Sequence, residues 1–216
     1  MYILNLLLRR KVQIDNFPQQ GAFVKKVIAL DIGGVCIQLR HKQFMHELNL
    51  PEWPDEVIKL NHEFECGRLT PEQWLQQNRK LLPQMSGISD QRFWTMFRAI
   101  IGPDQPGMAE LCGQWREKGY ELLFFSNTSS VHADEVWRKI SFAQHISGGI
   151  YSYECGVMKP DPGIYEEFEN KYGKPVLYLD DLPANVEQGL KMGWNAKLFE
   201  GTETLQKNDA SQNFSH

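Results

Sequence analysis

Three short apolar runs, each ending at a polar residue, constrain the fold of this chain more than any other feature. They are VIAL before Asp31, LLFF before Ser126, and VLYL before Asp180 and Asp181. Uninterrupted apolar runs of this length are typical of strands buried on both faces, as in a parallel sheet covered by helices. The chain is therefore predicted to be an α/β protein with a doubly wound, mostly parallel sheet.

Helices are predicted between these runs. Apolar residues recur at helical spacing over residues 108–115, and Gly119 follows as a C-terminal stop before the second run. After the third run, Pro183 stands at a helix start and Gly193 at its end, and a further strand is predicted over residues 196–199. Strands and helices that alternate in this way are joined by right-handed crossovers.

The interval between the first and second apolar runs is too long for a single crossover. It holds three candidate helices, which cover residues 55–65, the segment that opens with Thr70 and Pro71, and residues 92–101. Residues 38–106 are therefore predicted to form a helical insert, or cap, over one edge of the sheet. The aromatic residues expected in the core of this cap are Trp53, Trp74, Trp94 and Phe97.

The rest of the chain is predicted to comprise a core domain and two terminal segments. Residues 23–37 and 107–200 form the core domain, residues 1–22 an N-terminal extension, and residues 201–216 a polar, disordered tail. The extension opens with an apolar run that is too short to span a bilayer, and its positive charges follow that run, unlike those of a secretory signal. No association with a membrane is therefore expected.

Charge and cysteine content narrow the functional class. The net charge is −4, and no basic stretch is longer than Arg9-Arg10-Lys11, so a nucleic acid is not expected as a partner. The four cysteines are far apart and form no CxxC pair, which fits the reduced thiols of a cytoplasmic protein better than disulfides or a zinc site. The oligomeric state does not follow from the sequence.

Carboxylates at the ends of two of the runs predict a metal site. The C-terminal ends of parallel strands lie along one edge of a sheet, and open α/β sheets bind ligands outside that edge. Asp31, Asp180 and Asp181 are expected to meet there. Because no histidine or cysteine accompanies them, these oxygen ligands favour a hard cation, and Mg²⁺ is the usual one.

Other residues near the same edge predict an anion-binding site. The N–H groups of Gly33 and Gly34, together with Ser126 and Asn127, offer hydrogen-bond donors to an anion. Lys159, which stands before two prolines, adds a positive charge. Carboxylates, Mg²⁺, a lysine and small polar donors together indicate phosphoryl transfer.

These elements, which read DIGGV, SNT, KP and DDLPAN in chain order, resemble the motifs of the haloacid dehalogenase-like (HAD) superfamily, specifically its phosphatase branch. The resemblance covers about residues 25–200, and the helical insert after DIGGV is similar to the cap of many such phosphatases. It implies a Mg²⁺-dependent phosphatase whose partner is a small phosphorylated metabolite.

The resemblance also implies a role for each motif. Asp31 is the nucleophile that attacks phosphorus and forms an aspartyl-phosphate intermediate. Lys159 neutralises charge on this nucleophile and on the phosphoryl group. Ser126 and Asn127 bind phosphate oxygens.

The metal ligands follow from the same resemblance. Asp31 and Asp181 supply carboxylate oxygens, and Gly33 supplies its backbone carbonyl. Asp180 is either a further ligand or the partner of Lys159.

The first motif departs from the commoner pattern of the superfamily at Gly33. Most HAD phosphatases carry an aspartate there, which protonates the leaving group and later activates water, and such a group contributes about 10²–10⁴-fold in rate. A DxGG or DxGN motif resembles a subgroup of sugar-1-phosphate phosphatases. An anomeric or acyl phosphate leaves more readily than an alkoxide, so such substrates are expected to be favoured over sugar-6-phosphates.

Residues of the cap and of the helix starts provide supporting candidates. His62, Glu65 and Arg68 are candidate substrate contacts or a substitute acid, although such residues more often form a solvated helix face. Asn185 is expected to steady the metal loop through a hydrogen bond, and His132 to have a structural role.

Two other functions remain open at this stage. A haloacid dehalogenase uses the same aspartate nucleophile but needs no metal, and the acidic pair Asp180-Asp181 argues against it. A catalytically weak HAD-fold protein that binds phosphate or a partner is kept open by Gly33.

Overall fold

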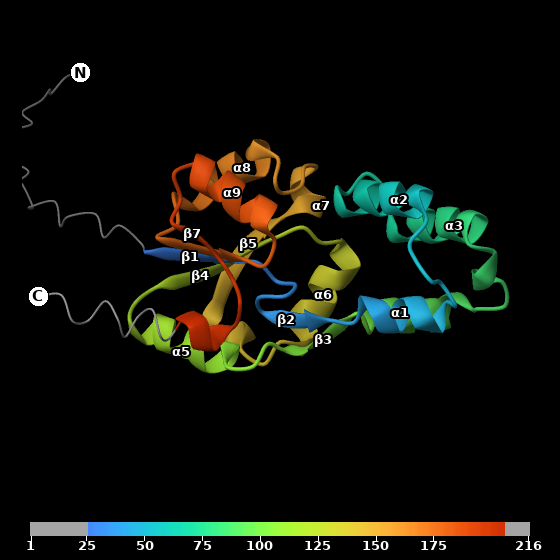
Figure 1. The fold of residues 1–216 in the computed structure, drawn as a ribbon, viewed down its shortest axis with the longest axis horizontal. Coiled ribbons are helices and arrows are strands. Elements are labelled where there is room, and N and C mark those ends of the chain that lie inside the picture. The colour runs from blue at the N-terminus through green and yellow to red at the C-terminus, as the bar shows by residue number, and fades with distance from the viewer. Residues whose placement is uncertain (1–25, 206–216) are drawn as a thin grey trace, which may run out of the picture.

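A central parallel sheet organises the computed structural model, which describes residues 26–205 (Figure 1). Its five strands lie in the order β5-β4-β1-β6-β7, and every neighbouring pair is parallel. This confirms the predicted doubly wound α/β fold. The strands are β1 (Val27–Leu30), β4 (Glu121–Ser126), β5 (Ile146–Tyr151), β6 (Leu177–Asp180) and β7 (Ala196–Leu198).

The strand order creates a crevice beside the central strand. From β1 the chain moves outward through β4 and β5, and then crosses to β6 and β7 on the other side of β1. The order therefore reverses between β1 and β6, and ligands of doubly wound sheets bind at such a point. The first and third apolar runs of the sequence end there.

The register of the three inner strands aligns their C-terminal ends. Leu30 of β1 pairs with Phe124 of β4 and with Leu179 of β6. The N–H of Asp31 continues the ladder by donating to the carbonyl of Leu179 at 2.9 Å. The polar residues that follow the strands consequently emerge at one edge of the sheet.

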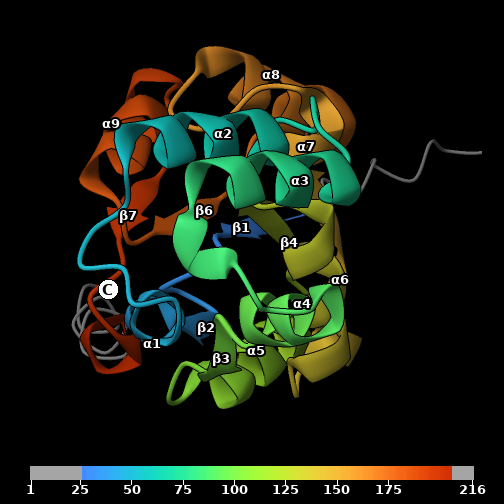
Figure 2. The same ribbon diagram turned by 90° about the vertical axis from the view of Figure 1, so that its right-hand side faces the viewer.

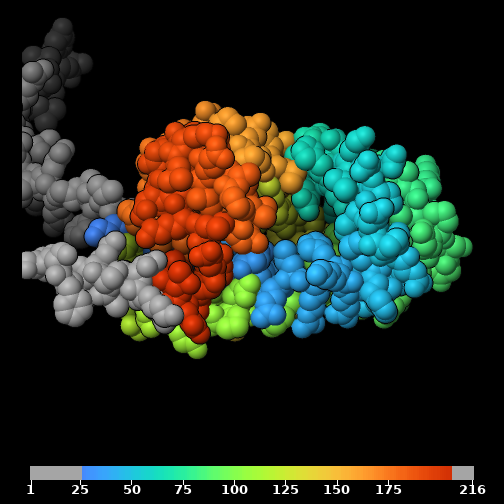
Figure 3. All heavy atoms as spheres, viewed as in Figure 1, coloured from blue at the N-terminus to red at the C-terminus, as the bar shows by residue number. Residues whose placement is uncertain are grey.

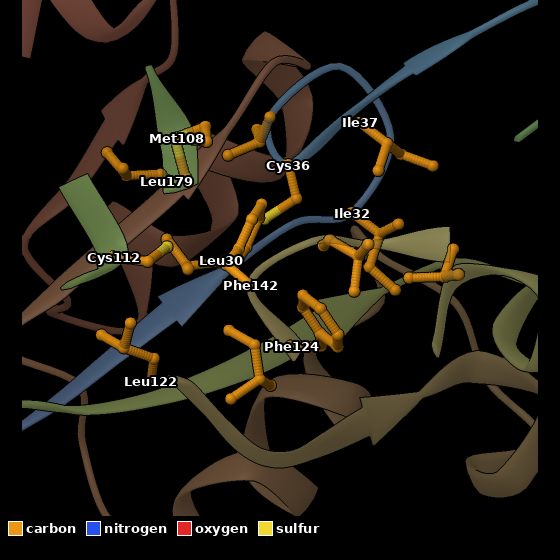
Figure 4. Packing of buried hydrophobic residues seen from close by; sticks show 14 of the residues in the cluster. Leu30, Ile32, Cys36, Ile37, Met108, Cys112, Leu122, Phe124, Phe142 and Leu179 are labelled. Carbon is orange, nitrogen blue, oxygen red and sulfur yellow. The ribbon is translucent and has the colours of Figure 1, made fainter. Parts of the chain in front are cut away.

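Helices cover both faces of the sheet, as the uninterrupted apolar runs predict. Ile28 and Leu30 of β1 belong to a hydrophobic cluster that includes Met108 and Val136 on one face (Figure 4). Val27 and Ala29 point to the other face because successive strand residues alternate. The helices are α5 (Met108–Glu117), α6 (Ser130–Lys139), α7 (Ser152–Cys155), α8 (Pro162–Tyr172) and α9 (Pro183–Lys191).

The predicted stops of two helices are confirmed. Gly119 follows α5 with a φ of 82°, and Gly193 follows α9 with a φ of 73°. Both values lie in the left-handed region, which a glycine enters at little cost.

The segment between β1 and α5 forms four α-helices framed by a pair of strands. Leu39 of β2 pairs with Ile101 of β3 in an antiparallel arrangement. The expected helices at 55–65 and after Thr70 are confirmed. The elements are β2 (Ile37–Leu39), α1 (His41–Glu47), α2 (Asp55–Glu65), α3 (Pro71–Leu81), α4 (Asp90–Arg98) and β3 (Ile101–Asp104), with a 3₁₀ turn at Pro83–Met85.

The third predicted helix was wrong at its C-terminal end. Residues 92–101 were expected to be helical throughout, but α4 stops at Arg98 and Ile101 begins β3. Ile101 is buried in the hydrophobic cluster under the sheet, so long-range strand pairing and burial override the local helical pattern. The division of the chain at residues 38 and 106 remains a prediction.

The inserted helices lie beyond the C-terminal ends of the strands. Figure 2 looks onto α2, α3 and α4 with the strands behind them, and the space-filling view shows these helices as a lobe beside the sheet (Figure 3). The lobe has an aromatic cluster of its own, in which Trp74 and Phe97 are buried and Trp53 and Trp94 partly buried. The four aromatic residues expected in the cap core are therefore found there.

The chain ends require one correction. The prediction of a disordered tail from residue 201 is wrong for residues 202–205, which form a helical turn. Thr202 is buried and its hydroxyl donates to the carbonyl of Pro106 at 2.9 Å, while Leu205 packs against the core. Residues 1–22 and 206–216 lie outside the described part of the chain.

Two further observations bear on the class of protein. Among the helices of residues 26–205, none is both long and apolar enough to cross a membrane. The four cysteines are free thiols, and three of them are buried.

The start of α3 provides a test of the cap's local stability. The Thr70 hydroxyl accepts the N–H of Gln73 at 3.2 Å, and the Gln73 side chain accepts the N–H of Thr70 at 2.9 Å. Thr70→Ala is predicted to lower the free energy of unfolding by about 1 kcal/mol, because it leaves N–H groups of the first turn without a partner. Thr70→Ser keeps the hydroxyl and should stay near wild type. Equal losses in the two variants, measured by denaturant unfolding, would contradict the capping role.

Candidate active site

A buried lysine links the carboxylates at the edge of the sheet. Lys159 lies between α7 and α8 and is only 4% exposed. Its ammonium group donates to Asp31 Oδ1 at 3.0 Å, to Asp180 Oδ2 at 2.6 Å and to the carbonyl of Phe125 at 2.6 Å. All three of its protons are engaged. Burial opposes its charge, but the two carboxylates outweigh burial and raise the pKa of Lys159.

The backbone of Lys159 is held by Asn127. The Asn127 side chain accepts the N–H of Lys159 at 2.7 Å and donates to the carbonyl of Lys159 at 2.8 Å. Asn127 was expected to bind phosphate oxygens, and the structure shows that one of its side-chain N–H groups and its side-chain oxygen bind the lysine backbone. Its second side-chain N–H and its backbone N–H are the donors that it can still offer to an anion.

Asp180 is the fixed partner of Lys159. One of its oxygens accepts from Lys159 and from the Tyr178 hydroxyl at 2.6 Å, and the other accepts from Leu182 N–H at 2.9 Å and Asn185 at 3.0 Å. Although burial acts to raise the pKa of Asp180, Lys159 and the other donors hold it below its ordinary value. Of the two roles left open for Asp180, the geometry favours partner of Lys159 over metal ligand. Asn185 steadies this loop as expected.

Asp31, Asp180 and Asp181 form a cluster of three carboxylates beside the single ammonium group of Lys159. Burial, opposed mainly by Lys159, raises the pKa of Asp31 to about 6. Burial and the neighbouring Asp180 also raise the pKa of Asp181. Oxygen atoms of the three aspartates lie within 4.8 Å of one another, and three carboxylates facing one ammonium leave a net charge of −2. This donor set fits a hard divalent cation.

The two glycines after Asp31 keep this region free of side chains. A Cβ on Gly34 would collide with the carboxylate of Asp181, and Gly34 has a φ of 74°. A Cβ on Gly33 would lie 2.6 Å from Cδ1 of Leu39, which covers this position. The backbone of the glycine loop therefore lies directly against the carboxylates.

Ser126 takes its expected place at the edge. It ends β4, is buried, and lies close enough to Asp31 for its hydroxyl to act to lower the pKa of that carboxyl. Ser126 is therefore close enough to the proposed nucleophile to share a bound phosphate with it.

The three candidate residues of the cap, His62, Glu65 and Arg68, lie in two different environments. Arg68 donates to both oxygens of Glu63, at 2.6 and 2.8 Å, and lies 3.2 Å from His62 Nδ1. The His62 side chain is 55% exposed, so these residues form a polar cluster at the surface of the cap. Glu65, by contrast, is half-buried, and burial together with the charge of Asp31 raises its pKa to about 7.

Glu65 also lines a cavity between the cap and α6. The cavity measures about 80 Å³. His132 of α6 stacks on Phe97 at 4.0 Å between ring centroids and donates from Nε2 to the Phe97 carbonyl at 3.0 Å. This supports the structural role expected for His132. The lining residues are His41, Trp53, Asn61, Phe64, Glu65, Trp74, Phe97, Ile100 and His132.

Two contributors to the site were not anticipated. Tyr178 lies inside an apolar run. The one sequence feature that could have indicated its role is that a buried tyrosine hydroxyl needs a hydrogen-bond partner, which here is Asp180. Ser152 donates from its hydroxyl to the backbone carbonyl of Glu65 at 2.6 Å and accepts from Thr128 N–H at 2.9 Å. Nothing in the local sequence marks that contact.

A cluster of carboxylates and a buried lysine thus lie at the edge of a doubly wound sheet where α/β enzymes bind their ligands. The sequence profile of the haloacid dehalogenase-like hydrolases matches residues 25–193. The chain belongs to this family.

Relatives and solved structures agree with that assignment. Flavin mononucleotide hydrolase 1 of Arabidopsis thaliana is 28% identical over 104 residues, which span 47% of this chain and 42% of the plant protein. A HAD-like family hydrolase from Porphyromonas gingivalis has the same fold, with a TM-score of 0.73 at 18% identity over 89% of this chain and 100% of that one. A HAD family enzyme of Bacteroides thetaiotaomicron, solved in complex with magnesium and inorganic phosphate, has a TM-score of 0.71 at 19% identity over 82% of this chain and 96% of that one.

The central ion cluster predicts a pH-dependent stability defect. Lys159→Met should lower the free energy of unfolding by about 3–5 kcal/mol in metal-free buffer, because it leaves buried carboxylates without a partner. A group whose pKa is raised in the folded state favours folding when protonated, so the variant should regain stability as the pH falls from about 8 to about 5.

The matched control is Lys191→Met. Lys191 pairs with Glu187 at 2.7 Å on the surface, so its removal should cost less than about 1 kcal/mol and show no such recovery. Urea unfolding of both variants across this pH range checks the prediction. A similar small loss for both lysines would contradict it.

Proposed function

We propose that this protein is a Mg²⁺-dependent phosphatase that hydrolyses a small phosphorylated metabolite through an aspartyl-phosphate on Asp31. The observation that carries the proposal is that the carboxylates around Lys159 differ in their hydrogen-bond donors. Asp180 accepts hydrogen bonds from four donors, whereas Asp31 accepts from Lys159, and Asp181 completes a cluster of three carboxylates beside this one ammonium group.

The metal would be held by Asp31, Asp181 and the backbone carbonyl of Gly33. When bound, Mg²⁺ offsets the charge of the phosphate and of the surrounding carboxylates. Ser126 and the N–H groups of the glycine loop orient the phosphate oxygens. The free oxygen of Asp31 attacks phosphorus, and water then hydrolyses the aspartyl-phosphate. Lys159 keeps the Asp31 carboxyl in place throughout, because its other two bonds anchor it to the sheet.

The relatives support this proposal from two directions. The Arabidopsis relative is named for hydrolysis of flavin mononucleotide, which is a phosphate monoester. The Bacteroides enzyme binds magnesium and inorganic phosphate in its crystals. A haloacid dehalogenase would have no use for an acidic cluster suited to a cation, so dehalogenation is the weaker proposal.

Phosphate release tests the proposal directly. With Mg²⁺, the protein should release inorganic phosphate from members of a broad panel of phosphate monoesters, and EDTA should abolish the release. Asp31→Asn should reduce it to background while leaving the fold intact, because an amide cannot serve as the nucleophile. Asp134→Asn, which removes an exposed carboxylate from α6, should remain active. Activity that survives in Asp31→Asn would contradict the assigned nucleophile.

A protein that binds phosphate without turnover is the alternative to an enzyme. It predicts no hydrolysis of any substrate in that panel, together with binding of phosphate or of a phosphorylated ligand. The same panel therefore separates the two functions.

For the substrate we propose a sugar-1-phosphate or a similar compound with a readily leaving phosphate. The support is the DIGGV motif, with no carboxylate at Gly33, and a cavity of about 80 Å³, which is below the roughly 300–1,000 Å³ of typical ligand pockets. Glucose-1-phosphate should therefore have a kcat/KM at least about tenfold above that of glucose-6-phosphate. Equal values for the two would remove the leaving-group argument.

Flavin mononucleotide is the second substrate candidate. It is favoured by the Arabidopsis relative and by the aromatic residues Trp53, Trp74 and Phe97 around the cavity. Its three-ring group needs a larger cavity than the structure shows. Including it in the panel distinguishes a small sugar from a flavin.

A further inference from the structure

The proposed phosphatase lacks a proton donor beside its nucleophile. Gly33 carries no side chain, and Leu39, itself 42% exposed, fills the space where one would begin. A leaving oxygen released near Asp31 must take its proton from another group. The described residues around the site offer few.

Most neighbouring groups that could carry a proton are already hydrogen-bonded or hold no proton to give. The three protons of Lys159 are bonded to Asp31, Asp180 and Phe125. His132 donates to the carbonyl of Phe97, and burial lowers its pKa to about 4, so it holds no spare proton near neutral pH. Burial also lowers the pKa of His41.

Two cap residues are excluded by their position. His62 and Arg68 cluster with Glu63 at the surface of the cap. Neither of them lines the cavity between the cap and α6. Glu65 remains.

The backbone of Glu65 is fastened to the core beside the phosphate loop. Its carbonyl accepts the Ser152 hydroxyl at 2.6 Å, and the same hydroxyl accepts the N–H of Thr128, two residues after Ser126. Two residues after Glu65, Gly67 packs so closely on Tyr153 that a Cβ on Gly67 would collide with the Tyr153 backbone. The last turn of α2 is thereby held against α7, which follows β5 at the same edge of the sheet.

The side chain of Glu65 lies at the cavity, in the neighbourhood of Asp31. It lines the cavity of about 80 Å³, and it is close enough to Asp31 for the charge of that residue to act on its carboxyl. No other side chain within residues 26–205 forms a hydrogen bond with it. Burial keeps a sizeable fraction of this carboxyl protonated near neutral pH.

We propose that Glu65 is the general acid and base of the reaction, supplied by the cap in place of a side chain at position 33. This inference rests on the proposed phosphatase function. It assigns to one cap residue the two proton transfers that the core lacks.

The proton transfers balance over one turnover. As Asp31 attacks phosphorus, the bond to the leaving oxygen breaks and the Glu65 carboxyl gives its proton to that oxygen, which leaves as an alcohol. The Glu65 carboxylate then takes a proton from the water that attacks the aspartyl-phosphate. The bond between Asp31 and phosphorus breaks, and inorganic phosphate, the Asp31 carboxylate and protonated Glu65 result.

Substrates that differ in leaving group test this role. Glu65→Gln keeps the shape of the side chain and removes its proton. For a simple alkyl phosphate, kcat/KM should fall by about 10²–10⁴-fold, whereas for 4-nitrophenyl phosphate, whose leaving group needs no proton, it should fall less than about tenfold. The preference for glucose-1-phosphate over glucose-6-phosphate should also increase, because the anomeric oxygen is the better leaving group.

Two further variants exclude a structural effect. Glu56→Gln changes an exposed glutamate in the first turn of α2 and should leave the kinetics of both substrates unchanged. Glu65→Asp keeps a carboxyl and should recover part of the activity on the alkyl phosphate that Glu65→Gln loses. Equal losses on the alkyl and nitrophenyl substrates in Glu65→Gln, or no loss on either, would overturn the proposal. A wild-type protein that hydrolyses neither substrate would overturn the phosphatase function itself, so the two failures are distinguishable.

Discussion

A single buried ammonium group connects the strand ends on which the site is built. Lys159 contacts Asp31 after β1, Phe125 in β4 and Asp180 at the end of β6. An uncompensated charge at this depth would destabilise the fold, so the lysine and the two carboxylates depend on each other. Asn127 fixes the lysine backbone from the same side. The position of Asp31, the proposed nucleophile, is thus set by the ion pair that permits charges to be buried there.

The chemistry of the site is divided between the core and the cap. In the proposed mechanism the core supplies Asp31 as nucleophile, a lysine and carboxylates for a cation, while Gly33 and the covering Leu39 offer no proton donor. The cap contributes Glu65, and Ser152 connects its backbone to the loop that follows β4. The proposed proton transfers therefore depend on the last turn of α2.

Sequence patterns predicted those features that depend on residues close together in the chain. Apolar runs predicted the buried strands, and Thr70 followed by Pro71 predicted the start of α3 and its N-cap residue. Sequence patterns were misleading where distant contacts decide, as at Ile101, which pairs with β2 instead of extending α4. The role of Asn127 depends on a hydrogen bond to a residue 32 positions away, and that of Ser152 on one 87 positions away. No local pattern encodes such pairings.

The central claim is that Asp31 carries the phosphoryl group during turnover. The most direct measurement is to quench the enzyme with acid during hydrolysis of a phosphate monoester, reduce the acyl phosphate with borohydride, and locate the modified residue by peptide mass spectrometry. The structure predicts that Asp31 is the reduced residue. When EDTA is present, the peptide that contains Asp31 should be unmodified. Modification of Asp180 or Asp181, or an unmodified Asp31 during steady turnover, would contradict the claim.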